Sequence, residues 1–254
     1  MQVSEIFWTL AAIVLGPFVG SFIGLLTLRL PAERPWAAGR SACDGCGRKL
    51  SPLDLIPILS FAALRGRCRS CGAAIPRRYL LLELACLGIG AWSATSFIGP
   101  MALATAVLGW WLLLLATIDA EHFWLPDMLT LPLGVVGFAV SILVLREPVW
   151  TPVLGAAVGF GSLWLLAFAY KRLRGREGLG GGDPRLLGAI GAWTGWSALP
   201  SVVVWAGLAG ISVALAQLVL RRRVTMDQRL PFGVFLAIGA WLTWLLGPLH
   251  GLFG

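Results

Sequence analysis

Long apolar segments recur along the whole chain and constrain its fold more than any other feature. Most run for about 18 to 24 residues, enough for a helix rising about 1.5 Å per residue to cross a hydrocarbon core of roughly 30 Å. Because 58% of the 254 residues are hydrophobic and only 13% are charged, a water-soluble enzyme is excluded. We predict an all-α integral membrane protein with about eight transmembrane helices. The expected spans are Phe7–Leu30, Leu80–Phe97, Met101–Ile118, Met128–Leu145, Val153–Tyr170, Leu186–Ala198, Val202–Leu220 and Phe232–Leu249.

The net charge of +8 comes from basic residues that gather in alternate connections between these spans. The segment from Arg29 to Arg78 holds ten of them, Lys171 to Arg185 holds five and Arg221 to Arg229 holds four, whereas only Arg146 falls on the opposite side. Cytoplasmic loops of membrane proteins carry such an excess of lysine and arginine. These three connections are therefore predicted to be cytoplasmic, with both chain termini outside. Since topology accounts for the charge, no nucleic-acid partner is expected.

Four of the five cysteines form two closely spaced pairs in the longest polar connection, residues 31–79. The pairs are Cys43 with Cys46 and Cys68 with Cys71, and 21 residues separate them. Disulfides are disfavoured in the reducing cytosol, and two such pairs can present four thiolates to one zinc ion at about 2.3 Å. We predict a small zinc-binding cytoplasmic insert between the first and second helices. Redox-active or free thiols are the alternative.

Four thiolates would fill the coordination sphere of that zinc ion, leaving no position for a water molecule. The metal would therefore hold the shape of the insert and would take no part in hydrolysis. Any chemistry must come from other side chains.

Acidic side chains are few, and several lie where predicted cytoplasmic loops meet the spans. Asp119 ends the third span, Asp127 begins the fourth, Asp183 precedes the sixth and Glu83 lies one turn into the second. Carboxylates at a membrane boundary are candidates for function, because moving a charged side chain into the hydrocarbon core costs free energy. The alternative is that these acids are simply solvated at helix ends.

Asp127 and Asp183 have a further interpretation, as caps of the helices that follow them, since each lies next to a proline. Asp183, however, also directly follows the segment Gly178–Gly182, in which four of the five residues are glycine. Such a segment lets a substrate come close to the backbone, at an entropic cost that a plain linker need not incur. The residues expected to bind substrate or cofactor are Gly180, Gly181, Gly182, Glu83 and Asp127.

Asp119 and Asp183 are the candidate acid–base pair. Asp119 closes a helix, where the helix dipole disfavours negative charge, and Asp183 opens one, where the dipole favours it. Two carboxylates brought close together share one proton, as in aspartic proteases. The hypothesis is that ionised Asp183 activates water while Asp119 holds the proton and donates it to the scissile carbonyl, which predicts a bell-shaped pH dependence.

Eleven features, taken in their order along the chain, carry a resemblance to a known family. They are Gly20-Ser21-Phe22, Arg29-Leu30-Pro31, the two cysteine pairs, Pro57–Ser60, Leu64–Cys68, Arg78-Tyr79 with Glu83, Ile118-Asp119, Leu125–Asp127, Gly180–Asp183, Leu186–Trp193 and Pro231-Phe232-Gly233. In these features the chain resembles the bacterial type IV prepilin peptidases, membrane aspartic proteases of the Gly-x-Gly-Asp type. The resemblance spans nearly the whole chain.

The resemblance implies that Asp119 and Asp183 cut the leader peptides of prepilins and pseudopilins at the cytoplasmic face of the bacterial inner membrane. It also implies methylation of the new N-terminal amine, with S-adenosylmethionine as methyl donor. The partners would be the substrates of a type IV pilus or type II secretion system, together with membrane lipids.

Three alternatives and a domain division complete the prediction. Family members commonly carry an asparagine where this chain reads Ile23-Gly24-Leu25, so a relative that cuts without methylating is one alternative. The others are a non-enzymatic membrane scaffold and a transport component. The expected parts are the first helix at residues 1–30, the insert at 31–79 and a seven-helix protease core at 80–254.

Overall fold

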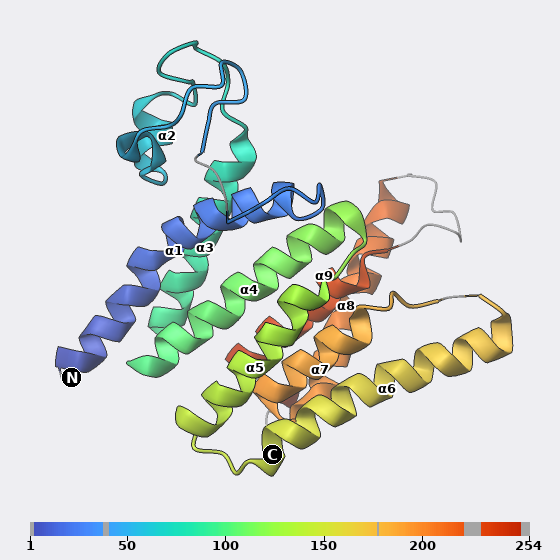
Figure 1. Ribbon diagram of the computed structural model, residues 1–254. Coiled ribbons are helices and arrows are strands. Elements are labelled where there is room, and N and C mark those ends of the chain that lie inside the picture. Colours follow the sequence, from blue (N-terminus) through green and yellow to red (C-terminus); the bar gives the residue numbers. More distant parts are fainter. Residues whose placement is uncertain (1–2, 38–40, 177, 221–229, 250–254) are drawn as a thin grey trace. The chain divides into compact units, whose positions relative to one another are not determined.

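The computed structural model describes residues 3–37, 41–176, 178–220 and 230–249 (Figure 1). Within these ranges the chain forms helices and no β-strand, which confirms the predicted all-α class. The α-helices are α1 (Val3–Arg29), α2 (Leu59–Ala63), α3 (Arg77–Ser96), α4 (Pro100–His122), α5 (Asp127–Leu143), α6 (Trp150–Arg174), α7 (Asp183–Thr194), α8 (Leu199–Val219) and α9 (Phe232–Leu246), and the short 3-10 helices are η1 (Pro52–Leu55) and η2 (Trp196–Ala198). The basic connection Arg221–Arg229 lies outside the described residues.

Each of the eight predicted spans coincides with a helix. Among the described residues, five helices are long and apolar enough to cross a membrane, namely Ser4–Arg29, Arg77–Ser96, Pro100–His122, Trp150–Arg174 and Trp196–Val219. The apolar helices α5 and α9 are shorter, with 17 and 15 residues, and α7 has only 12. Several spans of this kind make the chain a multi-pass membrane protein.

The chain divides into two compact units, residues 1–110 and residues 111–254, with the division inside α4. In the first unit α1 and α3 lie side by side, and the insert connects the end of α1 to the start of α3 (Figure 1). Gly20 makes this close contact possible, because a Cβ atom there would lie 2.6 Å from the Cα atom of Glu83. Small residues allow such close approach between membrane helices.

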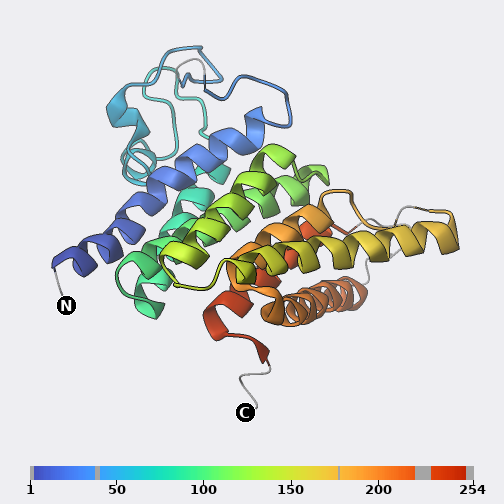
Figure 2. The ribbon, with the colours of Figure 1, turned by 60° about the horizontal axis from the view of Figure 1, so that its bottom comes forward.

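In the second unit α7 packs against both α5 and α6, and also contacts α9 (Figures 1 and 2). A Cβ atom at Gly159 of α6 would lie 2.5 Å from the carbonyl oxygen of Leu187, so the backbones of α6 and α7 are nearly in contact. On the α5 side, the indole Nε1 of Trp193 donates to the carbonyl of Leu133 at 2.9 Å. Ten of the twelve residues of α7 are buried, so this short helix is held by its neighbours.

Candidate active site and metal centre

Asp119 lies in the last turn of α4, and only 5% of its surface is exposed. Its Oδ2 atom accepts a hydrogen bond of 3.2 Å from the backbone N–H of Val234, in the first turn of α9. Gly233 allows this contact, since a Cβ atom there would lie 2.8 Å from the same oxygen. The start of α9 therefore rests directly on the carboxylate of Asp119.

Asp183 is the first residue of α7 and is 4% exposed. Its Oδ2 atom accepts a hydrogen bond of 2.9 Å from the backbone N–H of Gly180, and its own N–H donates to the carbonyl of Gly180 at 3.2 Å. The glycine segment thus turns back at Gly180 and contacts the carboxylate of Asp183. The N-cap position falls on Gly182 without a side-chain cap bond, so Asp183 is not the N-cap of this helix.

Leu125 connects the surroundings of the two acids. A Cβ atom at Gly182 would lie 2.6 Å from the Cβ atom of Leu125, and a Cβ atom at Gly233 would lie 2.8 Å from its Cδ1 atom. The two carboxylates are also close enough for a Coulombic interaction between Asp119 and Asp183. The end of α4 and the starts of α7 and α9 therefore meet around one acidic pair.

From the sequence, only the dipoles of the helices now labelled α4 and α7 were expected to act on Asp119 and Asp183. The structure adds the first turn of α9, whose backbone N–H groups point at the carboxylate of Asp119. N–H groups at a helix start stabilise negative charge, so they act against the unfavourable end of α4. Dipoles alone consequently do not rank the two aspartates as acid and base.

Asp127 and Glu83 make contacts of their own. Asp127 begins α5, where Pro126 is the N-cap, and its carboxylate accepts a hydrogen bond of 2.6 Å from Nη1 of Arg185. Both side chains of that ion pair are about half exposed. Glu83 belongs to the first unit, where it is buried in α3 and accepts a hydrogen bond of 2.7 Å from the backbone N–H of Ile58.

The four insert cysteines form one cluster, as predicted. Their Sγ atoms all lie within 4.8 Å of one another, and those of Cys43 and Cys71 are 3.8 Å apart. Four sulfurs arranged tetrahedrally at about 2.3 Å from a zinc ion would be separated by about 3.8 Å. The cluster therefore has the donors and the spacing that a metal ion requires.

The two cysteine pairs lie in two separate backbone turns of the same kind. The N–H of Gly47 donates to the carbonyl of Cys43 at 2.8 Å, and the N–H of Gly72 donates to that of Cys68 at 3.0 Å. Both glycines have positive φ angles, 69° and 71°, which favour glycine. Backbone hydrogen bonds from Cys71 and Ser70 lower the pKa of the Cys68 thiol to about 6, so this sulfur is readily available as a thiolate ligand.

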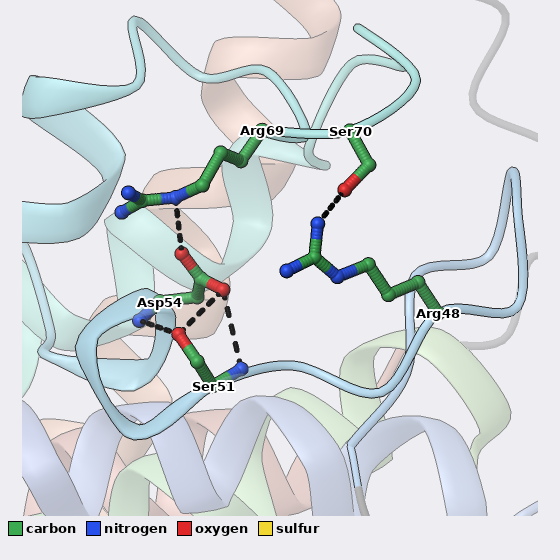
Figure 3. A network of polar contacts seen from close by, with 5 residues as sticks. All are labelled: Arg48, Ser51, Asp54, Arg69 and Ser70. Carbon is green, nitrogen blue, oxygen red and sulfur yellow. Dashed lines mark hydrogen bonds and ion pairs between the residues drawn. The ribbon is translucent and has the colours of Figure 1, made fainter.

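Polar side chains connect the two halves of the insert (Figure 3). Asp54 receives hydrogen bonds from the hydroxyl and the backbone N–H of Ser51, and Nε of Arg69 donates to it at 3.0 Å. Arg48 donates in turn to the hydroxyl of Ser70. The Ser51 hydroxyl and N–H, with Arg69, hold the pKa of Asp54 below its usual value. These contacts join the segment after the first cysteine pair to the second pair.

Three residues that contact the acidic site had no role predicted from the sequence, namely Leu125, Gly233 and Val234. Leu125 and Gly233 were present in the stretches that carry the family resemblance. Their position at the site follows only from contacts between residues far apart in the sequence, such as Asp119 and Val234, which are 115 positions apart.

Comparisons with known proteins match both parts of the chain. Residues 14–97 match the family model described as the bacterial peptidase A24 N-terminal domain, which includes the four-cysteine cluster. Residues 106–215 match the type IV leader peptidase family, a segment that includes Asp119 and Asp183. A comparison with solved structures finds no match.

Curated relatives align over almost the full length. Prepilin leader peptidase/N-methyltransferase of Burkholderia pseudomallei is 41% identical, covering 96% of this chain and 87% of the relative. The protein of that name from Pseudomonas aeruginosa is 36% identical over 94% of this chain and 91% of the relative, and the one from Dickeya chrysanthemi is 38% identical over 96% and 94%. Together with the buried aspartates and the four-cysteine cluster, these matches establish that the chain belongs to the type IV leader peptidase family.

Proposed function

We propose that this chain is a membrane aspartic endopeptidase that removes leader peptides from type IV prepilins or pseudopilins and then methylates the new N-terminal amine. The observation that carries the proposal is the pair of buried aspartates where α4, α7 and α9 meet. Both lie in the segment that matches the leader peptidase family. The names of the relatives support leader removal and methyl transfer together.

Asp119 and Asp183 are the catalytic residues of this proposal, acting as a pair that holds one proton. The ionised carboxylate takes a proton from a water molecule as the water oxygen attacks the scissile carbonyl carbon, and the protonated carboxylate donates its proton to the carbonyl oxygen. As the C–N bond breaks, the leaving amine takes a proton from one carboxyl group, and the other carboxylate takes a proton from a hydroxyl group of the tetrahedral intermediate, so that the pair again holds one proton. The substrate chain lies beside Asp183 along Gly180, Gly181 and Gly182 in this proposal, and a Cβ atom at Gly181 would contact nothing within 4 Å, so the backbone is open there.

The site faces the cytoplasm of a bacterial inner membrane in this proposal, with both termini outside. The basic connections at residues 31–79, 171–185 and 221–229 support this orientation by the positive-inside rule. The meeting of the end of α4 with the starts of α7 and α9 agrees with spans that alternate in direction. A leader peptide that emerges from a membrane-inserted prepilin would reach the aspartates at this surface.

The remaining assignments concern the insert and its ligands. Zinc held by Cys43, Cys46, Cys68 and Cys71 stabilises the insert, and S-adenosylmethionine supplies the methyl group. Glu83 and Asp127 are retained as cofactor-binding or substrate-binding residues. The substrates come from a type IV pilus or type II secretion system, and lipids surround the spans. The division into a first helix at residues 1–30, an insert at 31–79 and a protease core at 80–254 stays a prediction.

The test is cleavage of a co-expressed prepilin by Asp119→Asn and Asp183→Asn variants. Each change keeps the size of the side chain but removes the ability to exchange the proton, so leader removal should fall at least 1,000-fold, roughly the loss seen when a catalytic acid or base is removed. Glu147→Gln is the matched control, because this exposed residue precedes α6 and its carboxylate accepts a hydrogen bond from the hydroxyl of Thr151. Undiminished cleavage in either aspartate variant would disprove the catalytic assignment.

A cleavage-only enzyme is the second candidate, favoured by the absence of asparagine in Ile23-Gly24-Leu25. The mass of the processed pilin N-terminus separates the two functions, since methyl transfer adds one methyl group. An unmodified N-terminus with complete leader removal would support the cleavage-only enzyme.

A further inference from the structure

Two aromatic side chains are exposed in the turn that connects α4 to α5. Phe123 is 52% exposed and Trp124 is 41% exposed, whereas the next two residues, Leu125 and Pro126, are buried. Aromatic rings carry large apolar surfaces, and burying them is favourable. Proton transfer by the acidic pair uses neither ring, so peptidase chemistry alone does not account for their exposure.

The turn is attached to the acidic site at both of its ends. The backbone N–H of Phe123 donates to the carbonyl of Asp119 at 2.9 Å. Two residues later, Leu125 packs against Gly182 and Gly233. Both rings therefore belong to a short stretch whose two ends contact the residues that surround the acidic pair.

The start of α5 is fixed as well. Pro126 is its N-cap, and the carbonyl of Pro126 accepts a hydrogen bond of 3.1 Å from the N–H of Thr130. The indole Nε1 of Trp111 in α4 donates to the carbonyl of Leu129 in the first turn of α5 at 3.0 Å. These bonds fix the turn before any ligand arrives, which lowers the entropic cost of binding one there.

Phe123 occupies a backbone position that suits glycine. Its φ angle is 52°, in the left-handed region that residues with a Cβ atom rarely adopt. At the end of α6 the same position is filled by Gly175, whose N–H donates to the carbonyl of Lys171 four residues earlier, as that of Phe123 does to Asp119. Folding alone would favour glycine at the end of α4 too. Strained backbone is concentrated at functional sites, which indicates that the ring of Phe123 has a use.

The chemistry of the substrate supplies that use. A prepilin that is inserted in the membrane and cut at the membrane surface carries an apolar segment on one side of the cleaved bond. Exposed aromatic rings beside the acidic pair offer this segment an apolar surface to pack on. Anchoring of the turn in the lipid interface is the competing explanation, but an anchor can lie at any helix end and requires no left-handed backbone.

We propose that Phe123 and Trp124 bind the apolar segment of the prepilin next to the cleaved bond, and so hold that bond at Asp119 and Asp183. The inference rests on the leader-removal half of the proposed function and adds the residues that recognise the substrate. Both rings are binding residues that take no part in proton transfer. Because they contact the substrate equally before and during the reaction, their loss raises KM and leaves kcat unchanged.

The experiment measures kcat and KM for leader removal from a purified prepilin by the purified full chain, in one detergent. Phe123→Gly removes the first ring and suits the φ angle of 52°, and Trp124→Ala removes the second. Each change should raise KM about tenfold, as for the loss of one partly buried aromatic side chain, with kcat within about twofold of the wild-type value. Phe123→Tyr and Trp124→Phe keep a ring and should retain most of the affinity.

A second substrate separates recognition from anchoring. In this prepilin the apolar residues adjacent to the cleaved bond are replaced by alanine, which should raise the wild-type KM about tenfold. Phe123→Gly should add little to that loss, because effects of groups in contact are not additive. Trp150→Ala is the matched control, since this ring is 57% exposed at the first residue of α6, at the membrane surface predicted to lie opposite the site. It should cleave both prepilins like the wild-type chain.

Two results would overturn the inference and leave the proposed function in place. One is a wild-type KM in both ring-removing variants, and the other is an equal loss of affinity for both prepilins, which would identify the rings as membrane anchors. Thermal unfolding checks each variant, and Phe123→Gly decides the result alone if Trp124→Ala fails to fold. If the wild-type chain removes no leader from either prepilin, the proposed function fails, and the inference fails with it.

Discussion

The four-cysteine cluster and the pair of buried aspartates are assembled in different ways. Each half of the cysteine cluster is a short turn in which the backbone around two cysteines bonds to itself, as at Gly47 and Gly72. The aspartates come from helix ends 64 residues apart in the chain, and a third helix covers one of them. The first site is built from two local units, whereas the second exists only when several helices pack together.

This difference predicts which changes damage each site. A change within a cysteine turn should affect the insert through its metal. A change in the aspartate site can act from a residue that has no chemistry of its own, provided that the residue determines how two helices meet.

The largest expected effect is the loss of a metal ligand. Cys43→Ser and Cys68→Ser should each abolish binding of one zinc ion per chain and unfold the insert, because structural zinc contributes about 10 to 16 kcal/mol to small zinc-dependent domains. Zinc analysis of the purified chain and limited proteolysis of residues 31–79 would measure this. Cys86→Ala is the control, since that buried cysteine of α3 lies outside the cluster. Full zinc content in either serine variant would show that the four sulfurs do not share a metal.

A substitution at Gly233 should have the next largest effect, on the aspartate site. In Gly233→Val the new side chain would collide with Oδ2 of Asp119 and Cδ1 of Leu125 and shift the start of α9. Misplacement of a catalytic group by about 1 Å can cost about 100-fold in rate, so leader cleavage should decrease by that order. Gly207→Ala is the matched control, because a Cβ atom there would contact nothing within 4 Å. Normal cleavage by Gly233→Val would mean that the position of α9 does not matter to Asp119.

The smallest effect is expected at the exposed ion pair between Asp127 and Arg185, which links the starts of α5 and α7. With side chains 50% and 44% exposed, the pair should contribute less than about 1 kcal/mol to stability. A double-mutant cycle of Asp127→Asn and Arg185→Gln, followed by thermal unfolding at low and high salt, measures the coupling. A coupling well above that limit, or one insensitive to salt, would show that the packing of α5 against α7 depends on this contact.

Much of the architecture could be predicted from local patterns. Spans follow from the length of apolar segments, and every predicted span coincides with a helix. The cysteine spacing predicted the cluster, because two ligands with two residues between them in a tight turn point in the same direction. The interpretation of Asp183 and Asp127 as N-caps was wrong, since those positions fall on Gly182 and Pro126. A one-residue difference in where a helix starts lies below what sequence patterns resolve.

The composition and spacing of this chain were sufficient to indicate a helical membrane protein, a metal-binding insert and a short set of candidate acids, because each depends on neighbouring residues. Packing between helices decided that Gly233 lies on Asp119, that Leu125 connects Gly182 to Gly233, and that Glu83 is buried in α3. These contacts join residues far apart in the chain, and their geometry depends on how closely whole helices approach. No local pattern specifies that approach, because it results from the fit of many side chains at once.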